Sequence, residues 1–559
     1  MTGAAFARVA AAYARLRETG RPEVWITVRD EATALAEAEE IDRRVAAGQR
    51  LPLAGTAVAV KDNIDVAGLP TTAGSRAFAY DPDRDATAVA RLRAAGAVVI
   101  GKTNLDQFAT GLVGTRSPFG AVRNAWDPAR ISGGSSSGSA VATALGIVDL
   151  ALGTDTAGSG RVPAALNGVY GVKPTAGLVP ATGVVPACRT LDCVTVFARD
   201  LGTARRAAEL MSGADGVDPR ARPDQPAPAL DASPRVAVPT PEQLAGLADG
   251  WAEAFARVVA DLAAGGAEIV EVDIAPLLEA ATLLYGGAFV AERTAAVGDF
   301  IAAHPELVGD DLDPTVAAII LAGAQAGAVD YVRDCERLDL LGHEGLSRLD
   351  GAVALLTPTT TWHPTLAEVA VDPVGANARM GRYTNFANLL DRSALAVPAG
   401  AVAGLPFGVM LTGAPFADRT LAQLAERIAA PAVELLVVGA HLRGQPLNHQ
   451  LVSAGGSFVA DVRTAPTYRL YALPTTPPKP GLARVAAGGA AVAGELWRLP
   501  AAGFGTFVAN LPAPMGIGPV RLGDGRTVAG FLCEAVALEG APDITAYGGW
   551  RAYQGHRER

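Results

Sequence analysis

Two short segments rich in glycine and serine hold the residues best suited to catalysis. They are residues 133–139 (GGSSSGS) and 153–161 (GTDTAGSGR). Glycine permits tight turns and close approach, so these segments can present a serine hydroxyl beside free backbone N–H groups. The first histidine of the chain is His304, which leaves this region without the usual base for a serine nucleophile. Lys61, in the upstream segment VKDN, is therefore the expected base of a serine hydrolase.

These motifs resemble those of the amidase signature family, whose enzymes use a Ser-cisSer-Lys triad. The resemblance extends over roughly residues 50–430. It implies that Lys61 is the general base, that Ser135 is a bridging serine held by a cis peptide bond, and that Ser159 is the acyl nucleophile. The proton would pass from Ser159 to Ser135 and on to Lys61.

A lysine can accept this proton only when it is neutral, whereas its ordinary pKa is about 10.4. Burial lowers the pKa of an amine because it disfavours the charged form. The apolar run at residues 57–60 (AVAV) leads directly into Lys61 and suits burial. The alternative, an ordinary lysine at the end of a strand, is disfavoured by the two serine motifs.

The turn before Ser159 predicts an oxyanion hole, because consecutive backbone N–H groups can point at one developing charge. We expect Thr156, Ala157 and Gly158 to supply them. A phosphate-binding loop is the rival interpretation, but the chain has no GxxxxGK[ST] motif and no GxGxxG motif opening a helix after a strand. Arg161 is expected to hold the loop and not to touch substrate.

Three further serines, Ser136, Ser137 and Ser139, are expected to be structural. Their hydroxyls can cap the helix expected over residues 140–145. No catalytic role is needed to explain them.

Tyr285 and Arg293 are the expected substrate-binding residues. They lie eight positions apart, about two helical turns, so one helix face could carry both. A guanidinium matches a carboxylate with two parallel hydrogen bonds. Ala157 and Gly160 depart from the Gly-Gly-Ser-Ile pattern that is commoner in the amidase signature family. In this departure the chain resembles the allophanate hydrolases, one group of that family. The resemblance implies that the Tyr/Arg pair recognises the carboxylate of allophanate. A solvated helix face is the alternative.

The segment at residues 438–450 (VGAHLRGQPLNHQ) also resembles allophanate hydrolases. The resemblance implies that His449 assists decarboxylation of the first product, N-carboxycarbamate, since a histidine near neutral pKa can move a proton. The alternative is that His441 and His449 only satisfy hydrogen bonds at a domain interface. Glu534 and the turn at 515–518 are expected to line the same pocket.

Composition limits the remaining classes of function. The chain has 559 residues, of which 50% are hydrophobic and 19% charged, and its formal net charge is -10. An acidic chain without a dense Lys/Arg cluster argues against nucleic-acid binding. Four cysteines without CxxC spacing fit neither a disulfide framework nor a zinc site, and no metal or cofactor is expected. The N-terminus is expected to form an amphipathic helix and not a signal peptide; we expect no membrane span and a cytoplasmic location.

The distribution of short β-branched runs and alanine-rich stretches predicts an α/β fold, with a mixed sheet flanked by helices. Strands are expected at 56–60, 98–100 and 148–152, and helices at 86–95 and 139–145. Residues 219–234 are expected to be a surface loop. We expect an amidase domain over residues 1–430 and a smaller β-rich domain over 431–559, with strands at 435–438, 468–473 and 528–534; the latter domain resembles the γ-glutamylcyclotransferase-like domain of allophanate hydrolases.

The resemblance to allophanate hydrolases implies an enzyme that hydrolyses allophanate to ammonia and N-carboxycarbamate. The resemblance also implies a homodimer that works with urea carboxylase or other upstream enzymes. Two alternatives are kept: an amidase of another small amide, and an ammonia-supplying subunit of an amidotransferase complex. The acidic charge and the C-terminal extension argue against the second alternative.

Overall fold

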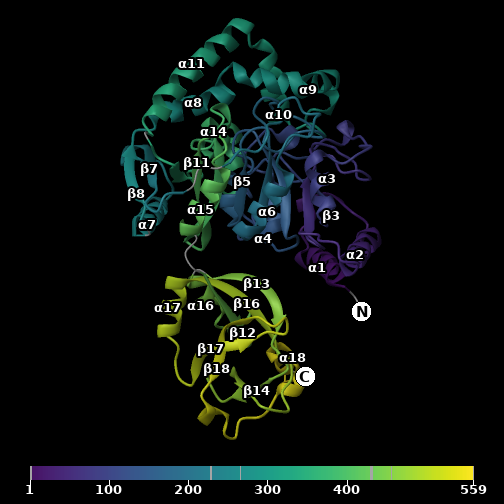
Figure 1. The fold of residues 1–559 in the computed structure, drawn as a ribbon, viewed down its shortest axis with the longest axis vertical. Coiled ribbons are helices and arrows are strands. Elements are labelled where there is room, and N and C mark those ends of the chain that lie inside the picture. The colour runs from purple at the N-terminus through teal and green to yellow at the C-terminus, as the bar shows by residue number, and fades with distance from the viewer. Residues whose placement is uncertain are drawn as a thin grey trace. The chain divides into compact units, whose positions relative to one another are not determined.

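The computed structural model describes residues 3–226, 230–264, 266–349, 351–428, 432–454 and 456–557. The chain divides into two compact units, Met1–Ile428 and Ala429–Arg559 (Figure 1). The domain boundary expected at residue 430 falls in 429–431, outside the described residues. Each unit has its own hydrophobic core.

The first unit is built on a mixed sheet that has eleven strands among the described residues. The sheet order is β1-β3-β2-β4-β6-β5-β10-β11-β9-β7-β8. Strand pairs β3–β2, β2–β4, β9–β7 and β7–β8 are parallel, and the other neighbours are antiparallel. The strands are β1 (Trp25–Val28), β2 (Ala57–Lys61), β3 (Val98–Thr103), β4 (Leu150–Asp155), β5 (Tyr170–Lys173), β6 (Cys193–Ala198), β7 (Arg235–Pro239), β8 (Glu268–Val272), β9 (Ala354–Pro358), β10 (Ser393–Val402) and β11 (Leu405–Gly413).

Helices cover both faces of this sheet, as the two-residue period of β2 demonstrates. Val58 and Val60 pack into one apolar cluster, whereas Ala57 and Ala59 pack into another. Both faces of the central strands are therefore buried under apolar side chains. The helices of this unit are α1 (Ala4–Thr19), α2 (Glu31–Ala46), α3 (Thr87–Ala94), α4 (Ser137–Ala144), α5 (Val162–Asn167), α6 (Leu201–Met211), α7 (Trp251–Ala264), α8 (Ala275–Gly286), α9 (Ala291–Ala303), α10 (Pro314–Ala322), α11 (Ala328–Ser347), α12 (Leu366–Val371), α13 (Pro373–Met380), α14 (Asn385–Leu389) and α15 (Asp418–Ile428).

The predicted α/β class with a mixed, helix-flanked sheet is confirmed. The expected strands at 56–60, 98–100 and 148–152 correspond to β2, β3 and β4, and the two expected helices correspond to α3 and α4. The strands extend further in the C-terminal direction than expected, because the buried sheet keeps polar residues such as Lys61 and Asp155 in its ladders. The described residues of 219–234 hold no helix or strand.

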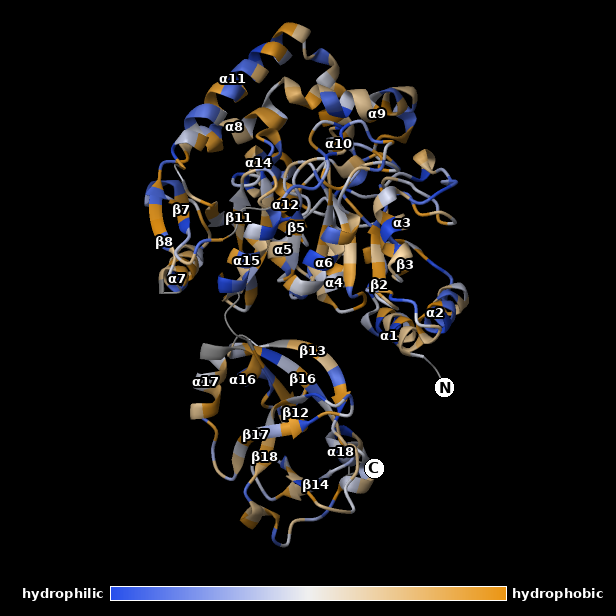
Figure 2. Ribbon diagram, viewed as in Figure 1, coloured by the Kyte–Doolittle hydropathy of each residue, from blue (hydrophilic) through white to orange (hydrophobic). Residues whose placement is uncertain are grey.

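Helices α8, α9, α10 and α11 lie together at one end of the first unit (Figure 1). The alternating hydrophilic and hydrophobic colours along α11 in Figure 2 fit a surface helix with one buried stripe. No single helix among the described residues is long and apolar enough to cross a membrane. One pair, Pro314–Gln325 with Ala328–Ser347, passes that test only when taken together, and it is bent by 100°.

The second unit is rich in β-structure, as expected. Among its described residues a five-stranded sheet has the order β13-β16-β12-β18-β17, and β14 pairs with β15. The expected strands at 435–438, 468–473 and 528–534 correspond to β12, β14 and β18, whereas the turn expected at 515–518 is the start of strand β17. The elements are β12 (Ala432–Val437), α16 (Asn448–Ser453), β13 (Ser457–Arg463), β14 (Tyr468–Leu473), β15 (Lys479–Arg484), β16 (Ala493–Pro500), α17 (Ala501–Ala509), β17 (Met515–Arg521), β18 (Thr527–Cys533) and α18 (Trp550–Arg557).

One buried ion pair beside β2 gives a prediction about stability. Lys102 Nζ lies 3.0 Å from Asp62 Oδ1, and both side chains are fully buried. Lys102→Met leaves the carboxylate of Asp62 buried and unpaired, so we expect the free energy of unfolding to fall by about 3–5 kcal/mol. Chemical denaturation measures this change.

The exposed pair Arg43–Glu40 provides the matched control, because its side chains are 74% and 52% exposed. Arg43→Met should change the free energy of unfolding by no more than about 0.5 kcal/mol. Equal effects of the two substitutions would contradict a structural role for the buried pair.

Candidate active site

Lys61 ends strand β2 inside the sheet, where β3 and β4 flank it on either side. Its side chain is fully buried. The Nζ atom donates to Ser135 Oγ at 2.8 Å and to Thr154 Oγ1 at 2.7 Å, with a longer contact to the Thr154 carbonyl at 3.5 Å. The apolar run that precedes Lys61 thus carries its amine into the interior, as the sequence predicted.

Burial lowers the pKa of Lys61 to about 7, although the carboxylates of Asp106, Asp192 and Asp155 oppose the shift. The physical cause is the loss of hydration of the ammonium form. A large fraction of Lys61 is therefore neutral near neutral pH, which a proton acceptor requires.

Thr154, at the end of β4, is a site residue that the sequence analysis did not single out. An ammonium has three N–H donors, and the three oxygens around Lys61 match them. When the amine loses a proton, the two oxygens of Thr154 can keep its two remaining N–H groups, which leaves the lone pair for Ser135. Asn63 Nδ2 also donates to Thr154 Oγ1, at 3.2 Å. The sequence offered no signal for this role except that Thr154 lies inside the GTDTAGS motif.

Ser135 is fully buried and follows a cis peptide bond to Gly134. Glycine is required at position 134, because an added Cβ would lie 2.0 Å from Asp106 Oδ2. The backbone N–H of Asp106 donates to the Ser135 carbonyl at 3.0 Å. The bridging serine is thus held by the loop that begins at Asp106.

The capping role expected for Ser136, Ser137 and Ser139 is wrong. Helix α4 begins at Ser137, and its N-cap makes no side-chain hydrogen bond. The three hydroxyls donate instead to the carbonyls of Thr154, Asn104 and Leu152, respectively. They are buried against β4 and the segment after β3, where carbonyl groups need donors.

Ser159 lies in the turn after β4 and is 2% exposed. Its Oγ donates to the Gly111 carbonyl at 3.5 Å, a long contact. Within the described part of the chain, no hydrogen bond joins Ser159 to Ser135. The structure therefore brings Lys61 and Ser135 into direct contact and leaves the hydroxyl of Ser159 only weakly engaged.

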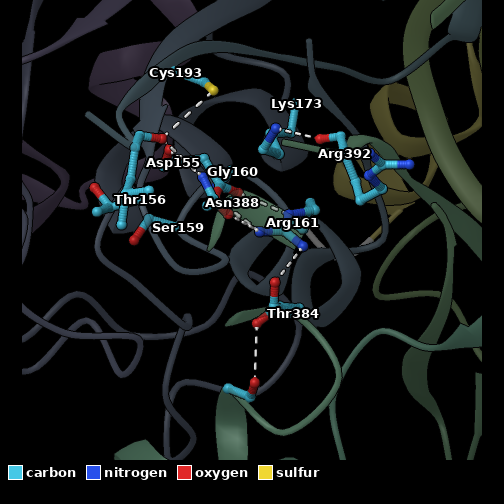
Figure 3. Close-up of polar contacts among 12 residues, drawn as sticks. Asp155, Thr156, Ser159, Gly160, Arg161, Lys173, Cys193, Thr384, Asn388 and Arg392 are labelled. Atoms are coloured by element: carbon cyan, nitrogen blue, oxygen red, sulfur yellow. Dashed lines mark hydrogen bonds and ion pairs between the residues drawn. The ribbon is translucent and has the colours of Figure 1, made fainter. Parts of the chain in front are cut away.

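Arg161 holds the turn that carries Ser159, as expected, and its side chain is buried (Figure 3). Its Nε and Nη2 donate to the two carboxylate oxygens of Asp155, each at 2.9 Å. It also donates to the Thr384 carbonyl at 2.9 Å and to Asn388 Oδ1 at 2.8 Å. The buried bidentate pair closes the turn between Asp155 and Arg161, and the hydrogen bonds to Thr384 and Asn388 connect this turn to α14.

The backbone N–H groups of Thr156, Ala157 and Gly158 donate to no other described residue. They are therefore available to a developing oxyanion. Gly158 has φ +149°, and a Cβ there would lie 2.4 Å from Thr384 Oγ1, so only glycine fits. The Thr156 hydroxyl donates to Asp192, whose pKa is raised by burial.

Tyr285 and Arg293, which the sequence predicted to share one helix face, lie on two different helices and are in contact. Helix α8 ends at Gly286 and α9 begins at Ala291, with the short 3₁₀ turn Ala288–Val290 between them. The Gly286–Gly287 pair breaks the helix. Arg293 Nη2 donates to Tyr285 Oη at 3.1 Å, and its guanidinium lies 4.8 Å from the centroid of the Tyr285 ring.

Arg293 is 1% exposed, yet its guanidinium forms no ion pair with a carboxylate of the described residues. Its other partners are Thr110 Oγ1 at 3.0 Å and the Ala109 carbonyl at 3.5 Å, and its Nε has no partner there. A buried cation without a counter-ion is costly. This arrangement suits an anionic ligand.

In the second unit His441 and His449 differ in their exposure to solvent. His449 is exposed, and its Nδ1 lies 2.9 Å from the Pro446 carbonyl. His441 is buried, stacks on Phe531 at 4.8 Å and contacts Gln450 Oε1 at 3.0 Å. Burial lowers the pKa of His441.

A cavity of about 210 Å³ in this unit is lined by His441, Gln450, Lys479, Asn510 and Met515, among others. The residues that line it include neither His449 nor Glu534. Lys479, which supplies a positive charge here, had no recognisable motif in the sequence.

Comparison with known proteins shows the family of the chain. Residues 8–422 match the family model described as Amidase, so the chain belongs to the amidase family, and the predicted family and enzyme class are confirmed. Residues 433–555 match the allophanate hydrolase C-terminal domain.

Individual relatives extend the comparison. The structure of the Kluyveromyces lactis allophanate hydrolase is similar to the chain, with a TM-score of 0.72 and 40% identity, over 99% of this chain and 97% of that one. A urea amidolyase of Lachancea kluyveri is 44% identical over 95% of this chain, which spans only 31% of that protein's length. A glutamyl-tRNA(Gln) amidotransferase subunit of Symbiobacterium thermophilum is 37% identical over 69% of this chain and 85% of its own length.

The pKa of Lys61 gives a prediction about pH dependence. If Lys61 is the base, only its neutral form is active, so kcat/KM for a cleaved amide should rise with pH through about 7 and then level off. Lys61→Met should be inactive across the range. The measurement is a pH profile of ammonia release.

His304→Ala serves as the control and should keep the profile of the parent enzyme. A profile that is abolished by His304→Ala and retained by Lys61→Met would overturn the assignment of the base.

Proposed function

We propose that this chain hydrolyses allophanate to ammonia and N-carboxycarbamate. The observation that carries the proposal is the buried guanidinium of Arg293, which lacks a carboxylate partner among the described residues. Allophanate has a carboxylate next to its amide and could supply that partner. The names of the relatives, allophanate hydrolase and urea amidolyase, support the same substrate.

The proposed reaction begins with attack of Ser159 Oγ on the terminal amide carbonyl of allophanate. The Ser159 proton passes to Ser135, which gives its own proton to neutral Lys61. The N–H groups of the turn at 156–158 stabilise the oxyanion. Return of the proton to the leaving nitrogen releases ammonia and leaves an acyl enzyme on Ser159.

Water then attacks the acyl enzyme and loses its proton along the same relay. The products are N-carboxycarbamate and free Ser159. The hydrogen bond of 2.8 Å between Lys61 and Ser135, which serves the second transfer of the relay, exists without ligand. The contact between Ser135 and Ser159 is the one that has to form during turnover.

Two other functions remain as alternatives. An amidase for a neutral amide would not require the unpaired guanidinium of Arg293. An ammonia-supplying role in an amidotransferase complex is supported by the 37% identity to the amidotransferase relative, but the match of residues 433–555 to the allophanate hydrolase C-terminal domain favours allophanate.

We also propose that the second unit assists decarboxylation of N-carboxycarbamate. The reaction consumes one proton and yields carbon dioxide and carbamate. The geometry favours His441 over the predicted His449, because His441 lines the cavity together with Lys479, whose charge suits a dianion. The homodimer and the link to urea carboxylase stay predictions; light scattering and co-purification would test them.

Arg293→Ala tests the substrate. Removal of the guanidinium deletes a charge-assisted pair with the carboxylate, so we expect KM for allophanate to rise by about tenfold or more and KM for a neutral amide such as biuret to change much less. Steady-state ammonia release from both substrates measures the effect.

Ser159→Ala gives the background rate of ammonia release, since it lacks the proposed nucleophile. Absence of allophanate turnover by the parent enzyme would overturn the proposed function. Equal losses on allophanate and biuret would instead show that Arg293 is structural.

Two histidine variants test the second unit. His441→Phe keeps an aromatic ring against Phe531 but removes the nitrogens, so we expect normal release of the first ammonia and delayed release of carbon dioxide. His449→Ala, at an exposed position, should keep both progress curves matched. Stopped-flow detection of ammonia and carbon dioxide measures them together; delay in His449→Ala alone would return the role to His449.

A further inference from the structure

Three consecutive residues of the loop after β3 contact both halves of the candidate site. The Gly111 carbonyl accepts from Ser159 Oγ at 3.5 Å. Thr110 Oγ1 accepts from Arg293 Nη1 at 3.0 Å, and the Ala109 carbonyl lies 3.5 Å from the same nitrogen. This loop is therefore a direct connection between the serine and the unpaired guanidinium.

The hydroxyl of Thr110 has a defined direction. It is fully buried and donates its single hydrogen to the Phe108 carbonyl at 3.2 Å. Its lone pairs are then left for Arg293. Phe108 and Ala109 adopt φ of +49° and +53°, a left-handed conformation that is uncommon for residues other than glycine. Such conformations persist where the surrounding structure enforces them.

The loop is anchored on both sides of Thr110. The carboxylate of Asp106 accepts from the backbone N–H groups of Val113, Gly114 and Arg116 at 3.0–3.2 Å. Arg116 Nη1 donates to the Thr110 carbonyl at 3.2 Å. Thr110 is thus held in place independently of Arg293.

Two of the five N–H donors of Arg293 have no partner among the described residues. A guanidinium has five N–H donors. Thr110 and Ala109 engage Nη1, and Tyr285 engages one hydrogen of Nη2. The Nε–H, which has no partner among the described residues, and the second Nη2 hydrogen remain. On a guanidinium the Nε–H and the adjacent Nη2 hydrogen point in the same direction and match the two oxygens of a carboxylate, and we take Tyr285 to accept the other Nη2 hydrogen.

We propose that Thr110 is a positioning residue that sets the preference of this site for carboxylate-bearing amides by orienting Arg293. The inference rests on the proposed function, since it concerns how the same site binds its substrate. Thr110 touches no reacting atom; it fixes Nη1 and thereby the direction of the free edge of the guanidinium. Its effect should therefore appear with anionic ligands and be small with neutral ones.

The test compares Thr110→Val, which keeps the shape of the side chain and removes the hydroxyl, with Thr110→Ser, which keeps the hydroxyl. Inhibition constants are measured for malonamate, an anionic analogue of allophanate, and for its neutral amide malonamide, beside KM and kcat for allophanate. Thr412→Val is the matched control, because the buried Thr412 hydroxyl has no hydrogen-bond partner among the described residues.

We expect Thr110→Val to raise KM for allophanate and the inhibition constant of malonamate about tenfold, with a smaller loss in kcat and less than about a twofold change for malonamide. Thr110→Ser should restore most of the affinity, and Thr412→Val should match the parent enzyme. If Thr110→Val does not fold, as judged by its thermal transition, Thr110→Ala takes its place.

Equal weakening of malonamate and malonamide, or no rescue by Thr110→Ser, would overturn the positioning role. A parent enzyme that binds malonamate but does not cleave allophanate would instead overturn the proposed function, and the comparison of the two inhibitors would still decide the role of Thr110.

Discussion

The buried amine of Lys61 is the constraint on which the rest of the site depends. An ammonium at the centre of a sheet is stable only if oxygens surround it, and a neutral amine there needs its lone pair directed at the hydrogen of a donor such as a hydroxyl. Ser135 and the two oxygens of Thr154 meet both needs. The position of Lys61 follows from the parallel pairing of β2 with β3 and β4, which brings three strand ends to the same place.

Two other buried cations of the first unit, Arg161 and Lys102, each have a carboxylate partner, whereas Arg293 has none among the described residues. Arg161 has Asp155, and Lys102 has Asp62. The charged groups of such pairs bond to each other within the protein. They therefore hold loops in place and are not left for a substrate. Arg293 has only neutral partners, Tyr285, Thr110 and Ala109, among the described residues. The cost of a buried charge without a counter-ion is the physical reason why we propose Arg293 as the place where an anion binds.

The second unit uses a different kind of site. Its cavity combines a buried histidine, an amide and a lysine around aromatic and proline side chains. Apolar walls with a few polar groups are typical of small-molecule sites. The candidate site of the first unit, by contrast, consists of backbone N–H groups and a guanidinium that contacts a loop with two residues of positive φ.

The sequence alone determined the family, the fold class, and the serine and lysine motifs. These features depend on the spacing of residues along the chain and on glycine at positions where the backbone passes close to another group. Gly134 and Gly158 illustrate this, since a Cβ at either would collide with a neighbour. Tyr285 and Arg293 were also paired correctly, but for the wrong reason: a break after α8, not a shared helix face, brings them together.

Only the tertiary structure decided which side chains join each candidate site. Thr154 and Thr110 in the first unit, and Lys479 in the cavity of the second unit, come from separate segments, and no local pattern marks a threonine or lysine whose partner lies far away in the chain. Histidines 441 and 449 belong to one motif, yet packing buries one and exposes the other. Side-chain burial is set by long-range contacts, so residue type and spacing predict the chemistry that is available, and the fold decides where it acts.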